Sequence, residues 1–195
     1  MTAVCLMIPF IAQGSVAMTS VNASQMTMHL LSDFTNGETS GWQLSTDRVM
    51  GGVSQGAARL VGAGPDRFAH LTGNVSTDNN GGFIQIRKRF ALGFAQGFDG
   101  VILRVRGNTE TYGVHLRNQQ SVRPWMNYRQ SFTVSEEWQD IILPFEAFLP
   151  SRPGIMPEKI DVDTVFSLGV VAFGGDFTAD LQIQHVGFYK QNRSI

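Results

Sequence analysis

Hydrophobic and polar side chains alternate with a period of two along several short segments of the chain. In residues 101–106, Val101, Leu103 and Val105 share one side, whereas Ile102 and two arginines share the other. Residues 112–117 repeat this pattern. A period of two is typical of a strand that buries one face. Related or more apolar runs predict further strands over residues 84–90, 125–134, 138–143, 166–173 and 181–189.

Segments rich in glycine and asparagine separate these strands. Such segments occupy residues 78–82, 98–100, 107–108 and 174–176, and their residue types favour tight turns. No long stretch has helical periodicity, and single helical turns are expected only where proline can begin one, at residues 144–148 and 157–160. Many short antiparallel strands joined by glycine-rich turns predict an all-β fold, an antiparallel β-sandwich or jelly roll.

The composition fits one globular domain. The chain has 195 residues, 43% of them hydrophobic, which is enough for a single core. We expect the domain to span residues 30–190. A net charge of -1 argues against a dedicated nucleic-acid binder. The single cysteine, Cys5, excludes an internal disulfide and a thiolate zinc cluster.

Residues 1–25 differ from the rest of the chain. No charged side chain precedes Asp33, and an apolar run over residues 3–12 is followed by small side chains. This order resembles a secretory signal without its positively charged leading region. We interpret the segment as a degenerate signal or a disordered tail. With a working signal, a bacterial protein would be periplasmic or exported; otherwise it would be cytoplasmic or peripherally associated with a membrane.

Charge is distributed unevenly along the chain. Residues 87–129 hold eight basic and two acidic side chains, whereas residues 130–195 hold nine acidic and four basic ones. The simplest expectation is that the basic middle pairs with the acidic end. Most of the basic side chains are arginines, which are favoured where planar, bidentate or stacked contacts matter.

A loop at residues 47–56 combines a charged dipeptide, two glycines and apolar neighbours. The glycines indicate a sharp turn or a close backbone approach. In one interpretation, Asp47 accepts backbone N–H bonds within the turn. In the other, Arg48 and Met50 are presented to a protein partner, because both residue types are enriched at interfaces. The candidate partner-binding loop consists of Asp47, Arg48, Met50, Gly51, Gly52 and Ser54.

A second glycine motif lies about thirty residues further on. Asparagine followed by glycine favours a tight turn, because both residues tolerate a left-handed backbone. We therefore predict a structural turn made of Asn79, Asn80, Gly81 and Gly82.

One polar strand face is a second candidate site. Two strands, 101–106 and 112–117, are expected to lie side by side with their basic side chains on one surface. Residues 125–134 would add either Trp125 and Arg129 or Tyr128 and Gln130. Aromatic rings on such a face could stack on sugar rings; the alternative is an ordinary solvated face, or one covered by the acidic end. The candidate ligand face consists of Arg104, Arg106, His115, Arg117, Trp125, Tyr128 and Gln130.

Groups suited to catalysis are scarce in the sequence. The four histidines lack the spacing of a helical metal pair, and no serine lies in a nucleophile elbow. The glycine runs lack both the lysine of a phosphate-binding loop and the dinucleotide-binding fingerprint. An enzyme would need Asp47, Asp78 and His115 to converge in one cleft. We therefore expect no catalytic residue, no metal site and no cofactor.

Five blocks of sequence occur in the order typical of one protein family. These are residues 47–54, 79–83, 98–107 and 138–148, with a final block from Ser167 through the last strand. Together they resemble the complex I intermediate-associated protein 30 family over about residues 30–190. The resemblance implies a galactose-binding-like β-sandwich, related in architecture to carbohydrate-binding modules.

The same resemblance suggests what the protein does. Mitochondrial members of the family are assembly factors for respiratory complex I (NADH:ubiquinone oxidoreductase) and hold its membrane-arm intermediates. The leading hypothesis is therefore a non-enzymatic assembly factor or chaperone for complex I or a related membrane complex, with protein partners and no nucleic acid. The alternative is a carbohydrate-binding module of the cell envelope. An enzyme on the same sandwich is the third hypothesis.

Overall fold

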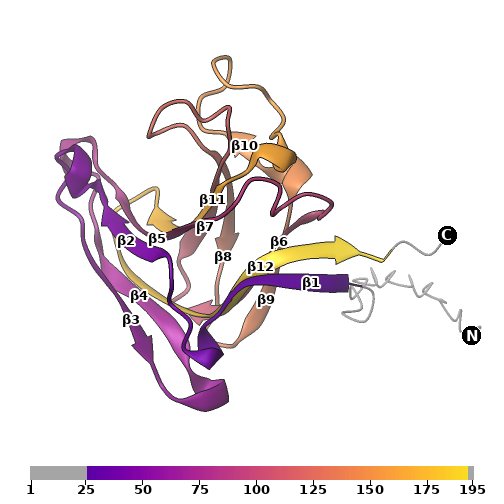
Figure 1. The fold of residues 1–195 in the computed structure, drawn as a ribbon. Coiled ribbons are helices and arrows are strands. Elements are labelled where there is room, and N and C mark those ends of the chain that lie inside the picture. Colours follow the sequence, from indigo (N-terminus) through magenta and orange to yellow (C-terminus); the bar gives the residue numbers. More distant parts are fainter. Residues whose placement is uncertain (1–25, 193–195) are drawn as a thin grey trace, which may run out of the picture.

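The computed structural model describes residues 26–192, which form two antiparallel β-sheets packed face to face (Figure 1). The predicted all-β antiparallel sandwich is confirmed. The signal-like segment, residues 1–25, lies outside the described residues. No helix within residues 26–192 is long and apolar enough to cross a membrane.

Each sheet has six strands. Sheet A follows the spatial order β3 (Gln55–Val61), β4 (Phe68–Val75), β12 (Phe177–Gln191), β6 (Gly100–Gly107) and β9 (Gln139–Pro144), with β1 (Met26–Asp33) paired to β12. Sheet B follows the order β10 (Leu149–Pro150), β8 (Tyr128–Thr133), β7 (Thr111–Arg117), β11 (Ser167–Phe173), β5 (Phe83–Arg89) and β2 (Trp42–Thr46).

The helical segments of the described chain are single 3-10 turns: η2 (Phe34–Asn36), η3 (Asp47–Met50), η4 (Gly64–Asp66), η5 (Asp78–Asn80), η6 (Phe145–Ala147) and η7 (Val162–Thr164). The turn expected at residues 144–148 is present as η6, with Pro144 just before it. The prediction of a helical turn at residues 157–160 is wrong. That segment is irregular, and the nearest 3-10 turn, η7, begins two residues after it.

The long strand β12 organises sheet A. One edge of β12 pairs with β4 through residues 177–183 and with β1 through residues 185–191, while its other edge pairs with β6. The register against β6 shifts between Ile183 and His185, which indicates a β-bulge. Three strands from distant parts of the sequence are therefore held by one strand.

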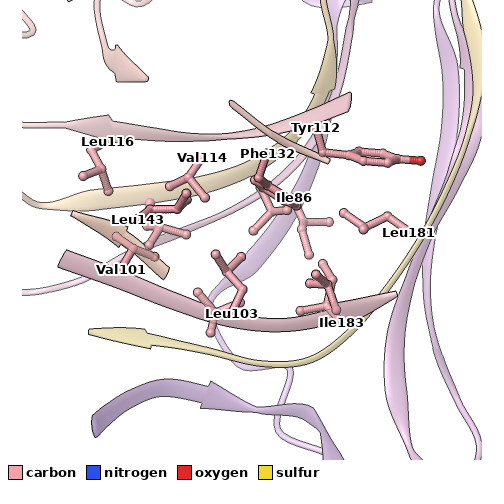
Figure 2. Packing of buried hydrophobic residues seen from close by; sticks show 14 of the residues in the cluster. Ile86, Val101, Leu103, Tyr112, Val114, Leu116, Phe132, Leu143, Leu181 and Ile183 are labelled. Atoms are coloured by element: carbon pink, nitrogen blue, oxygen red, sulfur yellow. The ribbon is translucent and has the colours of Figure 1, made fainter. Parts of the chain in front are cut away.

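The core fills the space between the sheets. Leu103 on β6 and Ile183 on β12 project from sheet A, and Val114 and Leu116 on β7 project from sheet B; all four are fully buried (Figure 2). Burying each such aliphatic side chain contributes about 1.5–3 kcal/mol relative to leaving it exposed. Their alternate neighbours point outward, so each sheet has an outer face that is free to carry polar groups.

Candidate functional site

A pocket with a volume of about 550 Å³ lies on the outer face of sheet B. This volume falls within the range of roughly 300–1,000 Å³ that is typical of small-ligand sites. The outward side chains of β2, β5, β7 and β11 form its floor, and two loops form its walls. The residues that line the pocket are Ser45, Val49, Met50, Phe83, Gln85, Arg87, His115, Arg117, Pro124, Trp125, Asn127, Ser167 and Gly169.

Strand register determines which side chains meet on the pocket floor. Gly169 of β11 lies directly between Arg87 of β5 and His115 of β7, and Arg129 of β8 follows in the same row. Directly paired residues of an antiparallel sheet point to the same face. Because Gly169 has no side chain, the backbone of β11 forms a low floor between the arginine and the histidine.

Apolar side chains form the walls of the pocket. Trp125, in the loop before β8, is 51% exposed, and Met50, in the loop that begins with Asp47, is 54% exposed. Phe83 lines the pocket from the start of β5. The structure therefore places Met50 of the candidate partner-binding loop beside His115, Arg117 and Trp125 of the candidate ligand face. Arg48 is exposed but does not line the pocket.

Several polar atoms of the pocket are shielded from solvent and lack a hydrogen-bond partner within the described residues. They are Nε of Arg87, Nε of Arg117, Nε2 of His115 and Oδ1 of Asn127. Buried polar atoms are nearly always paired, and leaving one unpaired costs about 1–3 kcal/mol. Four such atoms around one pocket make it the candidate site for a polar ligand.

Electrostatics distinguish the two kinds of nitrogen donor in the pocket. Burial and, secondarily, the neighbouring Arg129 lower the pKa of His115 to about 4, so its imidazole is neutral at pH 7. Burial, followed by the charges of Arg87 and Arg89, lowers the pKa of Arg117, although its guanidinium remains protonated at neutral pH. The positive charge of the pocket therefore comes from arginine.

Asp47 joins two loops. Its buried carboxylate accepts hydrogen bonds from the backbone N–H groups of Ser54 (2.9 Å), Gly82 (2.6 Å) and Phe83 (3.3 Å), and also from the Ser54 hydroxyl. Burial opposes the charged form, but these bonds, of which the one from Gly82 is the strongest, lower the pKa of Asp47 overall. Through these bonds, Asp47 fixes the loop that carries Met50 against the start of β5, although Asp47 and Ser54 do not themselves line the pocket.

The glycines of both motifs serve this junction in different ways. A Cβ at Gly52 or at Gly81 would collide with the Asp47 carboxylate. Gly51 has open space around it but a φ of +91°, a conformation that favours glycine. The predicted second turn is η5: Asn79 and Asn80 adopt left-handed φ values of 57° and 58°, and Gly82 has a φ of 116°.

Arg104 and Arg106 do not share a face with His115 and Arg117, so that part of the predicted ligand face is wrong. They lie on β6 in sheet A, whereas β7 belongs to sheet B. Their Nε atoms are also occupied, since Arg104 donates to Gln184 (3.2 Å) and Arg106 donates to Gln182 (2.7 Å). The chain crosses from one sheet to the other between these strands, and a period-two pattern cannot reveal this.

Tyr128 and Gln130 also lie away from the pocket. The tyrosine side chain is fully buried, and its hydroxyl donates to Gln120 or the Pro157 carbonyl at 2.9 Å. Gln130 pairs with the fully buried Val114, which places it on the inner side of sheet B. Of the two alternatives expected for residues 125–134, the outer face therefore carries Arg129, opposite His115, with Trp125 at the edge of the pocket.

Pairing of the basic middle with the acidic end is largely absent. Among residues 26–192, the ion pairs are His70–Asp180, Lys88–Glu38 and Arg104–Asp140, and only the last joins the two regions as predicted. The arginines of sheet B instead contact aromatic rings: Arg89 and Arg117 lie over Phe166, at 4.9 and 5.8 Å from its centroid. Their charges are left without carboxylate partners in the described chain.

The three groups required for the enzyme hypothesis do not converge. His115 lines the pocket, whereas Asp47 and Asp78 do not, and the Asp47 carboxylate is already engaged by four hydrogen bonds. Within residues 26–192 no three His, Cys, Asp or Glu side chains cluster in a way that could hold a metal ion.

Sequence reasoning missed the β5 contribution to the pocket. Gln85 and Arg87 alternate with the buried Ile84 and Ile86, which is the same signal that singled out His115 and Arg117. The run of three basic residues at the end of this segment obscured the alternation. Asn127, in the loop before β8, gave no such signal.

The two antiparallel sheets, with a pocket on the outer face of sheet B, define a β-sandwich. The sequence matches the family model described as complex I intermediate-associated protein 30 (CIA30) over residues 32–184, and the chain belongs to that family. The resemblance noted from the five sequence blocks is thereby confirmed. No curated protein matches the sequence significantly.

Solved structures of carbohydrate-binding modules share the fold. A family 11 module from Clostridium thermocellum, in complex with a β-1,3-1,4-mixed-linked tetrasaccharide, has a TM-score of 0.68 at 13% identity, covering 87% of this chain and 98% of that one. The family 11 module of a cellulosomal cellulase of the same organism has a TM-score of 0.66 at 14% sequence identity. The match covers 83% of this chain and 94% of that one. Part of an exo-β-agarase is also similar, with a TM-score of 0.55 at 9% sequence identity. That match covers 85% of this chain and 26% of the agarase. At these identities the likeness concerns the fold alone.

Proposed function

We propose that this chain is a non-enzymatic binding protein that recognises its partner through the sheet-B pocket and serves as an assembly factor for respiratory complex I or a related membrane complex. The observation that carries the binding role is the group of four shielded, unpartnered polar atoms around one pocket. Membership of the CIA30 family supports the assembly role. No Asp or Glu is among the residues that line the pocket, so an acid–base pair of carboxylates has no support there.

Affinity purification tests the assembly role. The protein, tagged at its C-terminus, is isolated from its host's membrane fraction alongside a variant with Arg48→Ala and Met50→Ala. We expect incomplete complex I to co-purify with the wild type and to be reduced with the variant, since Met50 forms an exposed wall of the pocket. The double variant Arg104→Gln, Arg106→Gln is the matched control on the other sheet. Absence of complex I subunits from every sample would contradict the assembly role.

A second function, carbohydrate binding, is favoured by the composition of the pocket. A half-exposed tryptophan stands beside shielded hydrogen-bonding groups, and pockets of this kind combine an apolar surface with a few polar groups that fix orientation. The similar folds include modules whose names state carbohydrate binding. Titration with a panel of neutral and acidic oligosaccharides tests this function, and no binding by any member would contradict it.

A further inference from the structure

The outer face of sheet B concentrates positive charge that the protein does not neutralise. Arg87 and Arg89 lie on β5, Arg117 on β7 and Arg129 on β8, with β11 between β5 and β7, and the four occupy neighbouring rows of the sheet. None has a carboxylate within 4.0 Å among residues 26–192. Mutual repulsion contributes to the lowered pKa of Arg117, after the larger effect of burial. An anion between these side chains would relieve that repulsion.

Sheet A shows how the same protein treats arginines that need no ligand. There, Nε of Arg106 donates to Gln182, and its guanidinium lies 4.8 Å from the ring centroid of Trp138. Arg104 bonds to Gln184 and to Asp140. By contrast, the Nε atoms of Arg87 and Arg117 are shielded from solvent and unused, although Nη2 of Arg117 donates to the carbonyls of Ser121 (2.9 Å) and Arg123 (3.0 Å). Since guanidinium groups bind carboxylate and sulfate oxygens through paired N–H donors, these two arginines match an anionic group.

The rest of the pocket suits a saccharide ring. Gly169 keeps the floor between Arg87 and His115 low, and a Cβ there would lie 2.9 Å from Oε1 of Gln85. The neutral imidazole of His115 can donate or accept a hydrogen bond at neutral pH. Trp125 supplies a flat apolar surface that is 51% exposed. A planar aromatic wall, neutral hydrogen-bonding groups and two arginines together match a sugar that carries a negative charge.

We propose that the sheet-B pocket binds an anionic saccharide, with its carboxylate or sulfate between Arg87 and Arg117 and its ring against Trp125. This inference rests on the proposed carbohydrate-binding function and specifies the class of sugar. An extended nucleic acid is a poor match, because the chain carries a net charge of -1 and only two arginines, Arg87 and Arg117, line the pocket.

Calorimetric titration of the full protein tests the proposal. The probes are trimers of galacturonic acid, glucuronic acid and mannuronic acid, a sulfated galactose trimer, and the neutral trimers of the corresponding hexoses. We expect at least one acidic trimer to bind about tenfold or more tightly than its neutral counterpart, and this preference to decrease as salt is raised. The carboxylate and sulfate probes distinguish the two sources of charge.

Variants assign the binding to the pocket. The double variant Arg87→Gln, Arg117→Gln should bind the acidic trimer about tenfold or more weakly, while its affinity for any neutral trimer stays unchanged. Trp125→Ala should weaken both. The control, Arg104→Gln with Arg106→Gln, removes the same charge from sheet A and should leave affinity unchanged. The single variant Arg87→Gln replaces the double variant if melting shows that the latter is unfolded.

The outcomes separate this inference from the function on which it rests. Equal binding of neutral and acidic trimers would overturn the anionic preference, and equal loss in the sheet-A control would overturn its assignment to the sheet-B pocket. Either result would leave carbohydrate binding intact. No binding of any saccharide would overturn both. Binding of a polyglutamate peptide as tight as that of the best acidic trimer would also overturn the proposal, because charge alone would then explain recognition.

Discussion

Replacing Asp47 by alanine should strongly destabilise the domain. The substitution would leave three backbone N–H groups, those of Ser54, Gly82 and Phe83, without their acceptor, whereas the Ser54 hydroxyl can still donate to the Ser76 carbonyl. At about 1 kcal/mol for each unpaired N–H group, the free energy of unfolding should fall by roughly 3 kcal/mol. That is a large share of the roughly 5–15 kcal/mol that stabilises a typical domain. Asp47→Asn keeps one oxygen but presents an N–H₂ group to donors, so about half the loss is expected.

The dependence on pH has a definite sign. Because the pKa of Asp47 is lowered in the folded protein, its stabilisation is present above the ordinary carboxyl value of 3.8 and is lost as pH falls through the lowered pKa. Asp47→Asn should therefore flatten the acid limb of the stability curve. Urea unfolding followed by tryptophan fluorescence at pH 7 and at pH 3 measures both effects.

A neighbouring aspartate provides the control. Asp78 is exposed and lies in the adjoining loop, so Asp78→Ala should change stability by no more than about 0.5 kcal/mol. If Asp47→Ala were as stable as Asp78→Ala at pH 7, the argument that the carboxylate joins the two loops would be refuted.

Three further predictions concern single positions. Gly81→Ala should lower stability by about 1–3 kcal/mol in thermal melts, because its Cβ meets the Asp47 carboxylate, whereas Gly175→Ala has open space; equal melting temperatures would contradict this. Burial is the main cause that raises the pKa of Tyr112 to about 12. Tyr112→Phe should therefore remove a tyrosine titration near pH 12 from the ultraviolet spectrum. An unchanged titration would refute the assignment to Tyr112. The free energy of unfolding of the wild type should decrease as pH falls from 6.5 to about 4, because His115 takes up a proton only when the protein unfolds. His115→Gln should make stability depend less on pH in this range. An identical pH dependence in both proteins would count against the lowered pKa of His115.

Local pattern predicted the strands better than it predicted their partners. The alternation in residues 101–106 and 112–117 correctly marked β6 and β7. It also marked correctly which side chains of each strand point out of the core. It could not tell that consecutive strands enter different sheets, so Arg104 and Arg106 were grouped with the wrong surface. Sheet assignment depends on long-range pairing, which is not encoded in the period of a single strand.

The first strands of the domain were missed for physical reasons. The side chains of β3 are mostly exposed, so this edge strand of sheet A shows no buried alternation. On β4 the signal was present, since Ala69, Leu71 and Val75 are buried at alternate positions, but Gly73 interrupts it. Burial therefore determines which strands can be read from sequence, and strands at an edge or broken by glycine are the hardest to detect.

The dependence of sheet A on β12 has a consequence for how the chain folds as it is synthesised. β1 pairs with residues 185–191, so contacts such as the Thr27–Asn192 hydrogen bond close over 165 residues. Neither β1 nor β4 can join β6 in one sheet until the ribosome has released β12. Such non-local pairing slows folding. Sheet A therefore stays incomplete until β12 has been synthesised, and its apolar strands are accessible to chaperones during that interval.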